Sequence, residues 1–169
     1  MPARKLNGRF LTEVFNLKGD PITENLSSVG RGETSMQTNQ AAEQAAISAA
    51  ERWLALVDAA NYAESWNQAS SLLKSGVQTS VLFKRGVREQ QWRSSTAAVQ
   101  TQLGKVEARS LRSKRYAEQL PGEPDGEYVV IEYDASFGSK KNAVEKVIVK
   151  KDQDGEWRVS GYKVILGHI

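Results

Sequence analysis

Residues 53–66 read WLALVDAANYAESW, and this stretch decides the fold because two of the four tryptophans flank one helix-to-helix corner. Before the corner, residues 41–58 are alanine-rich, without interruption, and carry an apolar band wider than a surface helix needs, which predicts a central helix. After the corner, Asn61 is suited to cap a second helix, which is expected to continue through Leu73 and to end at Gly76. The corner therefore predicts two packed helices that bring Trp53 and Trp66 into one core.

The rest of the chain predicts one more helix and then a sheet. A third helix is expected at 88–103, with Gly104 at its C-terminal cap. Beyond it the apolar period becomes two, and turn residues separate four expected strands, 105–120, 129–137, 143–151 and 157–166. Leu111 is out of phase and predicts a bulge, and Asp154-Gly155 predicts a tight hairpin. The expected fold class is α+β, with three N-terminal helices packed on a curved four-stranded antiparallel sheet.

Length and composition bound the domain organisation. The chain has 169 residues, 40% hydrophobic and 25% charged, which suits one ordinary globular domain. Residues 1–40 hold one short apolar stripe and a polar run, which predict a mobile N-terminal segment and linker before a single α+β domain at 41–169. No apolar run is long enough for a membrane helix, and no export signal is recognisable, so a soluble, cytoplasmic chain is expected as written. The absence of cysteine leaves the compartment open.

Charge argues weakly for an anionic partner. The net charge is +3, and residues 84–115 contain nine basic side chains against two acidic ones. A nucleic-acid surface would interleave aromatic side chains with these charges for base stacking. Only Trp92 and Tyr116 lie near, so a solvated basic face is predicted and nucleic-acid binding is not.

Few residues offer catalytic or metal chemistry. The only histidine, His168, is penultimate, and no Gly-x-Ser-x-Gly motif or His/Cys cluster exists, so no catalytic triad, metal or cofactor is expected. A carboxylate in an apolar pocket could act as a base beside a tyrosine. The candidates are Asp134 or Glu132 with Tyr62, Tyr128 or Tyr133. Strand alternation, however, predicts that both carboxylates point away from the pocket.

Aromatic side chains form the candidate ligand site. Six of them are expected at the core-facing phase of their elements: Trp53, Tyr62, Trp66, Trp92, Tyr133 and Trp157. They could fill the core or line a hollow pocket for a small hydrophobic ligand, and the sequence leaves both readings open. Asp58, beside the corner, is expected to accept hydrogen bonds from local backbone amides.

Three motifs support a family resemblance. They are WLxLVDxxxYxxSW at 53–66, PGxPDGEYVVI at 121–131 and DGxWRVSGY at 154–162. In this order they resemble the bacterial domain of unknown function 4019 family, over about residues 41–165. The resemblance implies a cone-like, cystatin-like fold similar to nuclear transport factor two and ketosteroid isomerase, in which helices close over a bent sheet. It implies no settled activity, and it implies periplasmic or secreted relatives, since family members often begin with an export signal.

Both faces of the predicted sheet carry apolar side chains. Val147 and Val149 share one face, while Val144 and Ile148 are expected on the other together with Tyr162 and Val164. One helical layer covers a single face, so the chain is expected to form a homodimer through the sheet. The predicted function is a non-catalytic small-ligand-binding or protein-assembly module. The alternative is an isomerase or dehydratase-type enzyme that uses a pocket carboxylate and a tyrosine on a small hydrophobic substrate.

Overall fold

The computed structural model describes residues 26–75 and 89–167. Within them the elements are α1 (Leu26–Asp58), α2 (Tyr62–Asn67), α3 (Ser71–Ser75), α4 (Glu89–Leu103), β1 (Val106–Ala117), β2 (Tyr128–Phe137), β3 (Ala143–Lys151) and β4 (Trp157–Leu166). The fold class is α+β, as predicted, but the described residues form four helices instead of three. The chain divides into two compact units between Gln37 and Thr38. The unit that begins at Thr38 holds the sheet, α2 to α4 and the C-terminal part of α1.

Helix α1 begins earlier than predicted. It starts at Leu26, so the polar residues expected to form a linker are helical from there up to position 40. No proline interrupts residues 26–58, and extending an existing helix costs far less than nucleating one. The short helical stripe expected near the N-terminus lies outside the described residues.

The predicted second helix is split into α2 and α3. Its start is confirmed, because Asn61 caps α2 and accepts the backbone N–H of Glu64 at 3.4 Å. The break comes at Ser70, whose backbone N–H donates to the carbonyl of Val159 at 2.8 Å instead of to a helical carbonyl. The Ser70 hydroxyl then accepts the N–H of Leu72 at 3.2 Å, and so starts α3 as a competing side-chain acceptor.

The sheet is an antiparallel meander of order β1-β2-β3-β4. Its four strands begin and end within three residues of the predicted bounds. Gly104 caps α4 with φ +79, and Gly155 turns the last hairpin with φ +86, a conformation that favours glycine. Both turn predictions are thereby confirmed.

Bulges set which side chains face the helices. In β1 the register shifts at Glu107 and again at Arg112, which confirms the predicted irregularity of this strand. In β4, Ser160 is the extra residue, because Val149 pairs with Val159 and Ile148 pairs with Gly161. The extra residue reverses the alternation that the sequence predicted for the rest of β4.

The reversal in β4 corrects the predicted faces. Tyr162 pairs with Val147 and Val164 pairs with Glu145, so both lie on the helix side of the sheet. Tyr162 is buried in the core there. The prediction that Tyr162 and Val164 share a face with Val144 and Ile148 is wrong, because a bulge cannot be read from alternation alone.

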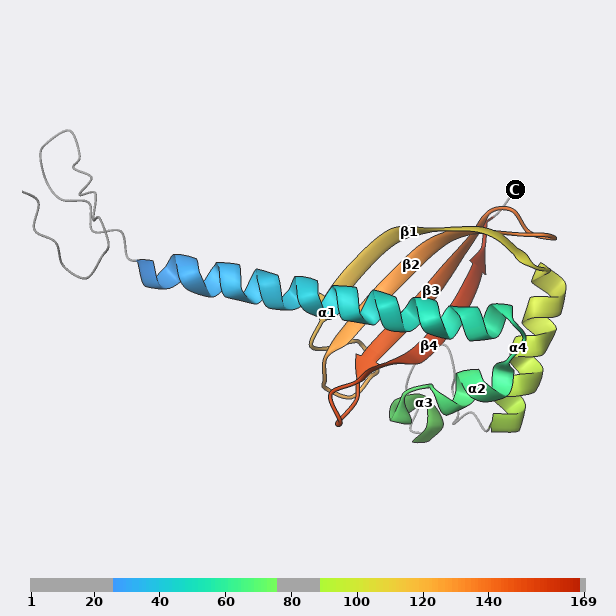
Figure 1. The fold of residues 1–169 in the computed structure, drawn as a ribbon, viewed down its shortest axis with the longest axis horizontal. Helices are drawn as coiled ribbons and strands as arrows, with labels where there is room; N and C mark the ends of the chain where they lie inside the picture. The colour runs from blue at the N-terminus through green and yellow to red at the C-terminus, as the bar shows by residue number, and fades with distance from the viewer. Residues whose placement is uncertain (1–25, 76–88, 168–169) are drawn as a thin grey trace, which may run out of the picture. The chain divides into compact units, whose positions relative to one another are not determined.

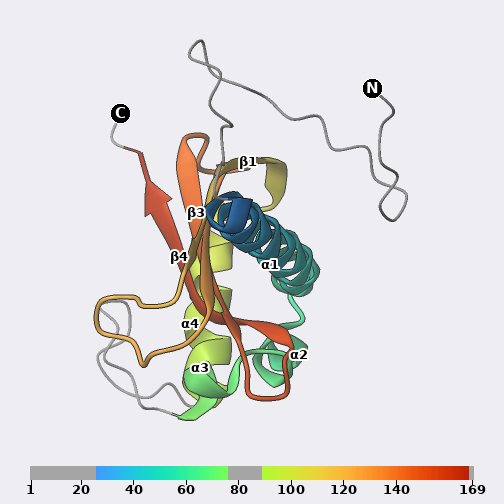
Figure 2. The ribbon, with the colours of Figure 1, turned by 90° about the vertical axis from the view of Figure 1, so that its left-hand side faces the viewer.

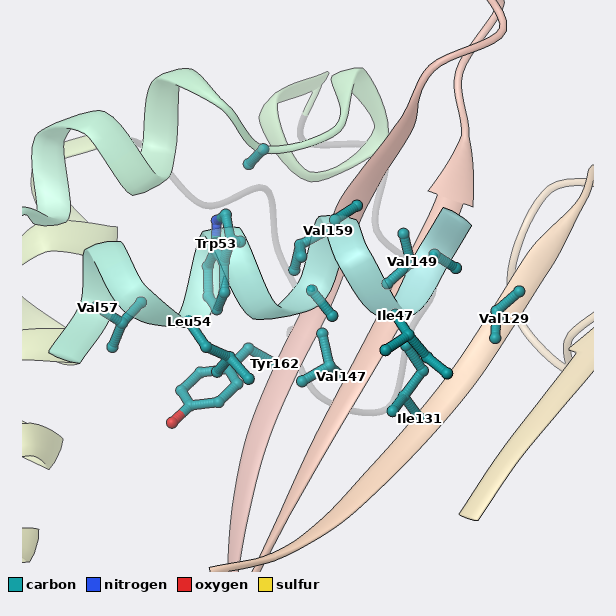
Figure 3. Packing of buried hydrophobic residues seen from close by; sticks show 14 of the residues in the cluster. Ile47, Trp53, Leu54, Val57, Val129, Ile131, Val147, Val149, Val159 and Tyr162 are labelled. Carbon is teal, nitrogen blue, oxygen red and sulfur yellow. The ribbon is translucent and has the colours of Figure 1, made fainter. Parts of the chain in front are cut away.

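One helical layer covers one face of the sheet. Figures 1 and 2 show the part of α1 from Thr38 onward running along one side of the four strands, with α2 and α4 near its C-terminal end. Figure 3 shows side chains of α1, such as Ile47 and Leu54, directed at the valines and isoleucine of the strands. Trp53 packs against Trp92 and Tyr162 with ring centroids 5.6 and 5.3 Å apart. Each such buried large side chain contributes roughly 1.5 to 3 kcal/mol.

Candidate functional site

A polar cluster lies between α1 and the sheet. The guanidinium of Arg109 donates to Glu145 from Nε at 2.5 Å and from Nη2 at 3.2 Å. It also donates to Asp58 from Nη1 at 2.8 Å and from Nη2 at 3.0 Å. The hydroxyl of Tyr162 donates to Glu145 at 2.7 Å. Asp58, Arg109, Glu145 and Tyr162 are called the Arg109 cluster below.

Backbone features bring these four residues together. The β1 bulge at Glu107 places Arg109 on the helix side, where it pairs with Ala135 of β2. Helix α1 ends just after Asp58, since Ala60 adopts a left-handed φ of 58. A carboxylate at the C-terminus of a helix is unfavourable against the helix dipole, and the cation of Arg109 offsets that repulsion.

Burial of its carboxylates makes the Arg109 cluster important for the stability of the fold. The side chain of Glu145 is 0% exposed, whereas those of Arg109 and Asp58 are 18% and 23% exposed. A fully buried carboxylate is costly unless it is paired and hydrogen-bonded. Glu145 accepts three hydrogen bonds, two from Arg109 and one from Tyr162. Its charge is therefore held in place by its neighbours.

The protonation states of the donors follow from the same contacts. Burial acts to lower the pKa of Arg109, but hydrogen bonds and charges from Asp58 and Glu145 raise it above its usual value. Burial raises the pKa of Tyr162, and the charge of Glu145 and the hydrogen bond to it raise it further. Arg109 thus stays cationic and Tyr162 stays a neutral donor. The cluster carries one cation against two carboxylates, a net charge of −1.

Two sequence interpretations are corrected here. Asp58 was expected to bind backbone amides at its own corner, but its carboxylate reaches Arg109 of β1. Arg109 belongs to the run predicted to be a solvated basic face, yet its side chain is only 18% exposed. Lys114 of the same run is exposed, as predicted, and lies on the helix side of β1. Lys114 pairs with Glu43 of α1 at 3.3 Å. Two acidic residues of α1, Asp58 and Glu43, therefore form ion pairs with basic residues of β1.

The six predicted aromatic residues divide into a buried and a half-buried group. Trp53, Trp92 and Tyr133 are buried in the core, and Tyr62, Trp66 and Trp157 lie half-buried at its edge. Sequence reasoning missed the residue that joins two of them, Ser65, which is fully buried. Its carbonyl accepts the indole N–H of Trp53 at 2.8 Å and its hydroxyl accepts that of Trp92 at 3.0 Å. The signal was its spacing of three from Tyr62, which places both on one helix face.

Surface grooves touch part of the aromatic set. One of about 330 Å³ lies between α1, the end of α2 and the β3–β4 hairpin, and Trp53, Trp157, Arg52 and Glu156 are among its lining residues. The ammonium of Lys151 sits 5.9 Å from the centre of the Trp157 ring. Another, of about 830 Å³, runs beside Tyr62 and α4. Tyr133 and Trp92 line neither groove.

The predicted orientation of the candidate base residues is confirmed. Glu132 pairs with Lys146 at 3.5 Å and Asp134 pairs with Arg112 at 3.2 Å, on the side of the sheet opposite the helices. Sequence reasoning missed Glu145 as the inward-facing carboxylate of β3. The signal was its place between Ala143 and Val147 at alternating positions.

Metal-ligand chemistry finds no support in residues 26–75 and 89–167. Within these ranges no three His, Cys, Asp or Glu side chains gather as a metal site would require. The only histidine, His168, lies outside the described residues. None of the described helices combines the length and apolar character that crossing a membrane requires.

An α+β domain with one helical layer over an antiparallel meander defines the class of the protein. The profile of the family described as "Protein of unknown function (DUF4019)" matches residues 49–162. The chain belongs to this family. No curated protein and no solved structure matches the chain. The family description assigns no activity.

Proposed function

We propose that this protein is a non-catalytic protein-assembly module that forms a homodimer through the outer face of its sheet. The outer face is the side opposite α1, and its central side chains are those of Val130, Glu132, Asp134, Val144, Lys146, Ile148, Lys163 and Ile165. Together with the helical layer over the other side, we take this arrangement as the cone-like, cystatin-like fold implied by the family resemblance. The observation that carries the proposal is the mixture of apolar and paired charged side chains on the outer face.

The apolar part supplies the driving force for association. Val144 and Ile148 are half-buried, and Ile165 is 39% exposed. At about 3.3 Å per residue and 4.8 Å between strands, four strands of this length present roughly 600 Å². A stable interface buries about 800 Å² on each partner. The area therefore favours a weak, reversible dimer.

The charged part is compatible with a twofold arrangement. Glu132 and Asp134 lie on β2, and lysines lie on β3 and β4, so a twofold axis can place the acids of one copy over the lysines of the other. Among the strand residues of this face cations outnumber acids, with Arg112, Arg115, Lys146, Lys150, Arg158 and Lys163 against Glu107, Glu132 and Asp134. This surplus opposes association and again favours a weak dimer.

Sedimentation equilibrium of the full chain from micromolar to millimolar concentration tests the dimer. We expect a reversible monomer–dimer equilibrium that Ile165→Lys shifts toward monomer. Val99→Lys is the matched control, because Val99 of α4 is 41% exposed, much like Ile165, but lies away from the outer face. A chain that stays monomeric at every concentration, or two variants that behave alike, would contradict the proposal.

A second proposal concerns a small hydrophobic ligand. It is favoured by the groove of about 330 Å³, because Trp53 and Trp157 both belong to the predicted ligand site and both line it. Titration with 8-anilinonaphthalene sulfonate, followed by dye fluorescence, is the test. Trp157→Ala should weaken dye binding, while Trp66→Ala, which does not alter a residue lining this groove, should leave it unchanged. Equal binding by both variants would exclude this groove.

The enzyme alternative rests on one pair of residues. A pocket carboxylate and a tyrosine are what the isomerase or dehydratase mechanism needs, and Glu145 with Tyr162 is such a pair. A base must reach the substrate proton, whereas the side chain of Glu145 is 0% exposed and held by Arg109. We therefore place this alternative second to the assembly function.

A further inference from the structure

The hydroxyl of Tyr133 is a buried polar group that lacks a hydrogen-bond partner among the described residues. Tyr133 as a whole is 2% exposed. Buried hydroxyls in folded proteins nearly always have a partner, either a protein group or an ordered water. The position of this atom therefore points to a bound species.

The strand register places Tyr133 beside the Arg109 cluster. Tyr133 pairs with Glu145 on β3 and with Leu111 on β1, so these side chains are direct neighbours on the helix face. Arg109 lies two residues before Leu111. Burial raises the pKa of Tyr133 to about 12, the charge of Glu51 adds to the rise, and the charge of Arg109 opposes it. The charge of Glu145 also raises this pKa, so three charged groups act on the Tyr133 hydroxyl.

Arg109 retains one donor for such a species. A guanidinium has five N–H groups. Four of them are used, one on Nε and one on Nη1 together with both on Nη2. In the part of the chain that the structure describes, the second N–H on Nη1 has no protein acceptor.

We propose that Tyr133 Oη and Arg109 Nη1 hold one internal water molecule at the edge of the Arg109 cluster. A water accepts the N–H of Arg109, bonds to the Tyr133 hydroxyl and donates to a carboxylate, which gives the three hydrogen bonds typical of buried water. The net charge of −1 disfavours an anion, and the cationic guanidinium of Arg109 disfavours a metal cation. The water links Tyr133 to the Arg109 cluster as its fifth member. This role does not depend on the proposed assembly function.

A crystal structure of the full chain that resolves ordered waters is the primary test. We expect density within about 2.6 to 3.2 Å of both Tyr133 Oη and Arg109 Nη1. Absence of that density, or a Tyr133 hydroxyl bonded directly to a protein atom, overturns the proposal.

Thermal melting provides a second test. The melting temperature of Tyr133→Phe should fall if the water is present and rise if the hydroxyl is unpaired. Tyr133→Phe removes a bonded hydroxyl if the water is present, and the melting temperature should fall by about 3 °C. Tyr128→Phe is the matched control, because the Tyr128 hydroxyl donates to the Pro124 carbonyl at 2.6 Å in the fully buried Tyr128 side chain. A rise in the melting temperature of Tyr133→Phe would show that an unpaired polar group had been removed, and would overturn the proposal.

Discussion

Replacing Arg109 with methionine tests whether the Arg109 cluster stabilises the fold. Methionine keeps most of the aliphatic length of arginine and removes all four hydrogen bonds to the two carboxylates. Glu145 would then remain 0% exposed with only the Tyr162 hydroxyl as a donor. A buried charge without its counter-ion is the most destabilising product of such a change.

The expected magnitude follows from the burial of each carboxylate. Loss of the pairing to Glu145 should cost about 3 to 5 kcal/mol, the range for breaking a buried ion pair from one side. Asp58 is 23% exposed, so water can solvate it, and Asp58→Asn should cost only about 1 kcal/mol. Since a domain is stable by about 5 to 15 kcal/mol, Arg109→Met should leave a marginal fold.

Urea unfolding at pH 7, followed by tryptophan fluorescence, measures both changes. The double variant Asp58→Asn/Arg109→Met should be little less stable than Arg109→Met alone, because both changes remove the same contact. Arg109→Met/Glu145→Met should recover much of the loss, since an apolar pair needs no counter-ion. A cost for Arg109→Met no larger than that for Asp58→Asn, with unchanged m-values, would refute this reasoning.

Three further predictions concern other parts of the core. Ser65→Ala should cost about 1 to 3 kcal/mol in urea unfolding, since the buried Trp92 N–H loses its acceptor; the exposed Ser94→Ala should cost under about 0.5 kcal/mol. Ala60→Gly should stabilise the protein by about 0.5 kcal/mol, because it relieves a left-handed φ of 58 at some cost in unfolded-state entropy; no gain in melting temperature would contradict this. Stability should fall between about pH 10 and 12, because the Tyr133 pKa is raised to about 12 and the unfolded chain releases that proton first. Alkaline melts should show a shallower fall for Tyr133→Phe.

Sequence patterns predicted those parts of the fold that local residues determine. Asn61 caps its helix because its own side chain reaches the first turn, and Gly104 and Gly155 adopt the left-handed conformation that glycine tolerates. The strand bounds followed from turn residues in the same way. Ser70 was harder to predict, because its backbone N–H binds a carbonyl of a strand far along the chain. A break of that kind depends on tertiary contact.

The candidate site was less predictable for the same reason. Arg109 and Asp58 meet only when the sheet has formed and α1 has packed on it. The sequence alone therefore predicts a local role for Asp58 and a solvated one for Arg109. The bulge at Ser160 moved Tyr162 to the helix side, where its hydroxyl could meet Glu145. Alternation in β3 did carry a signal for Glu145, because a carboxylate at a core-facing position requires a partner. The identity of that partner depends on the register of β1, which the bulges set.

The charged contacts also fix how α1 lies along β1. Glu43 and Asp58 mark two points on the helix about 22 Å apart, and their partners Lys114 and Arg109 mark two points on β1 about 16 Å apart. Both pairs form together, with the helix and the strand running in opposite directions. The alanines of α1 at positions 42, 45, 46, 49 and 50 would by themselves tolerate a shift of one turn. Such a shift would leave Arg109 without Asp58 and Lys114 without Glu43, so the ion pairs select one packing of the helix on the sheet.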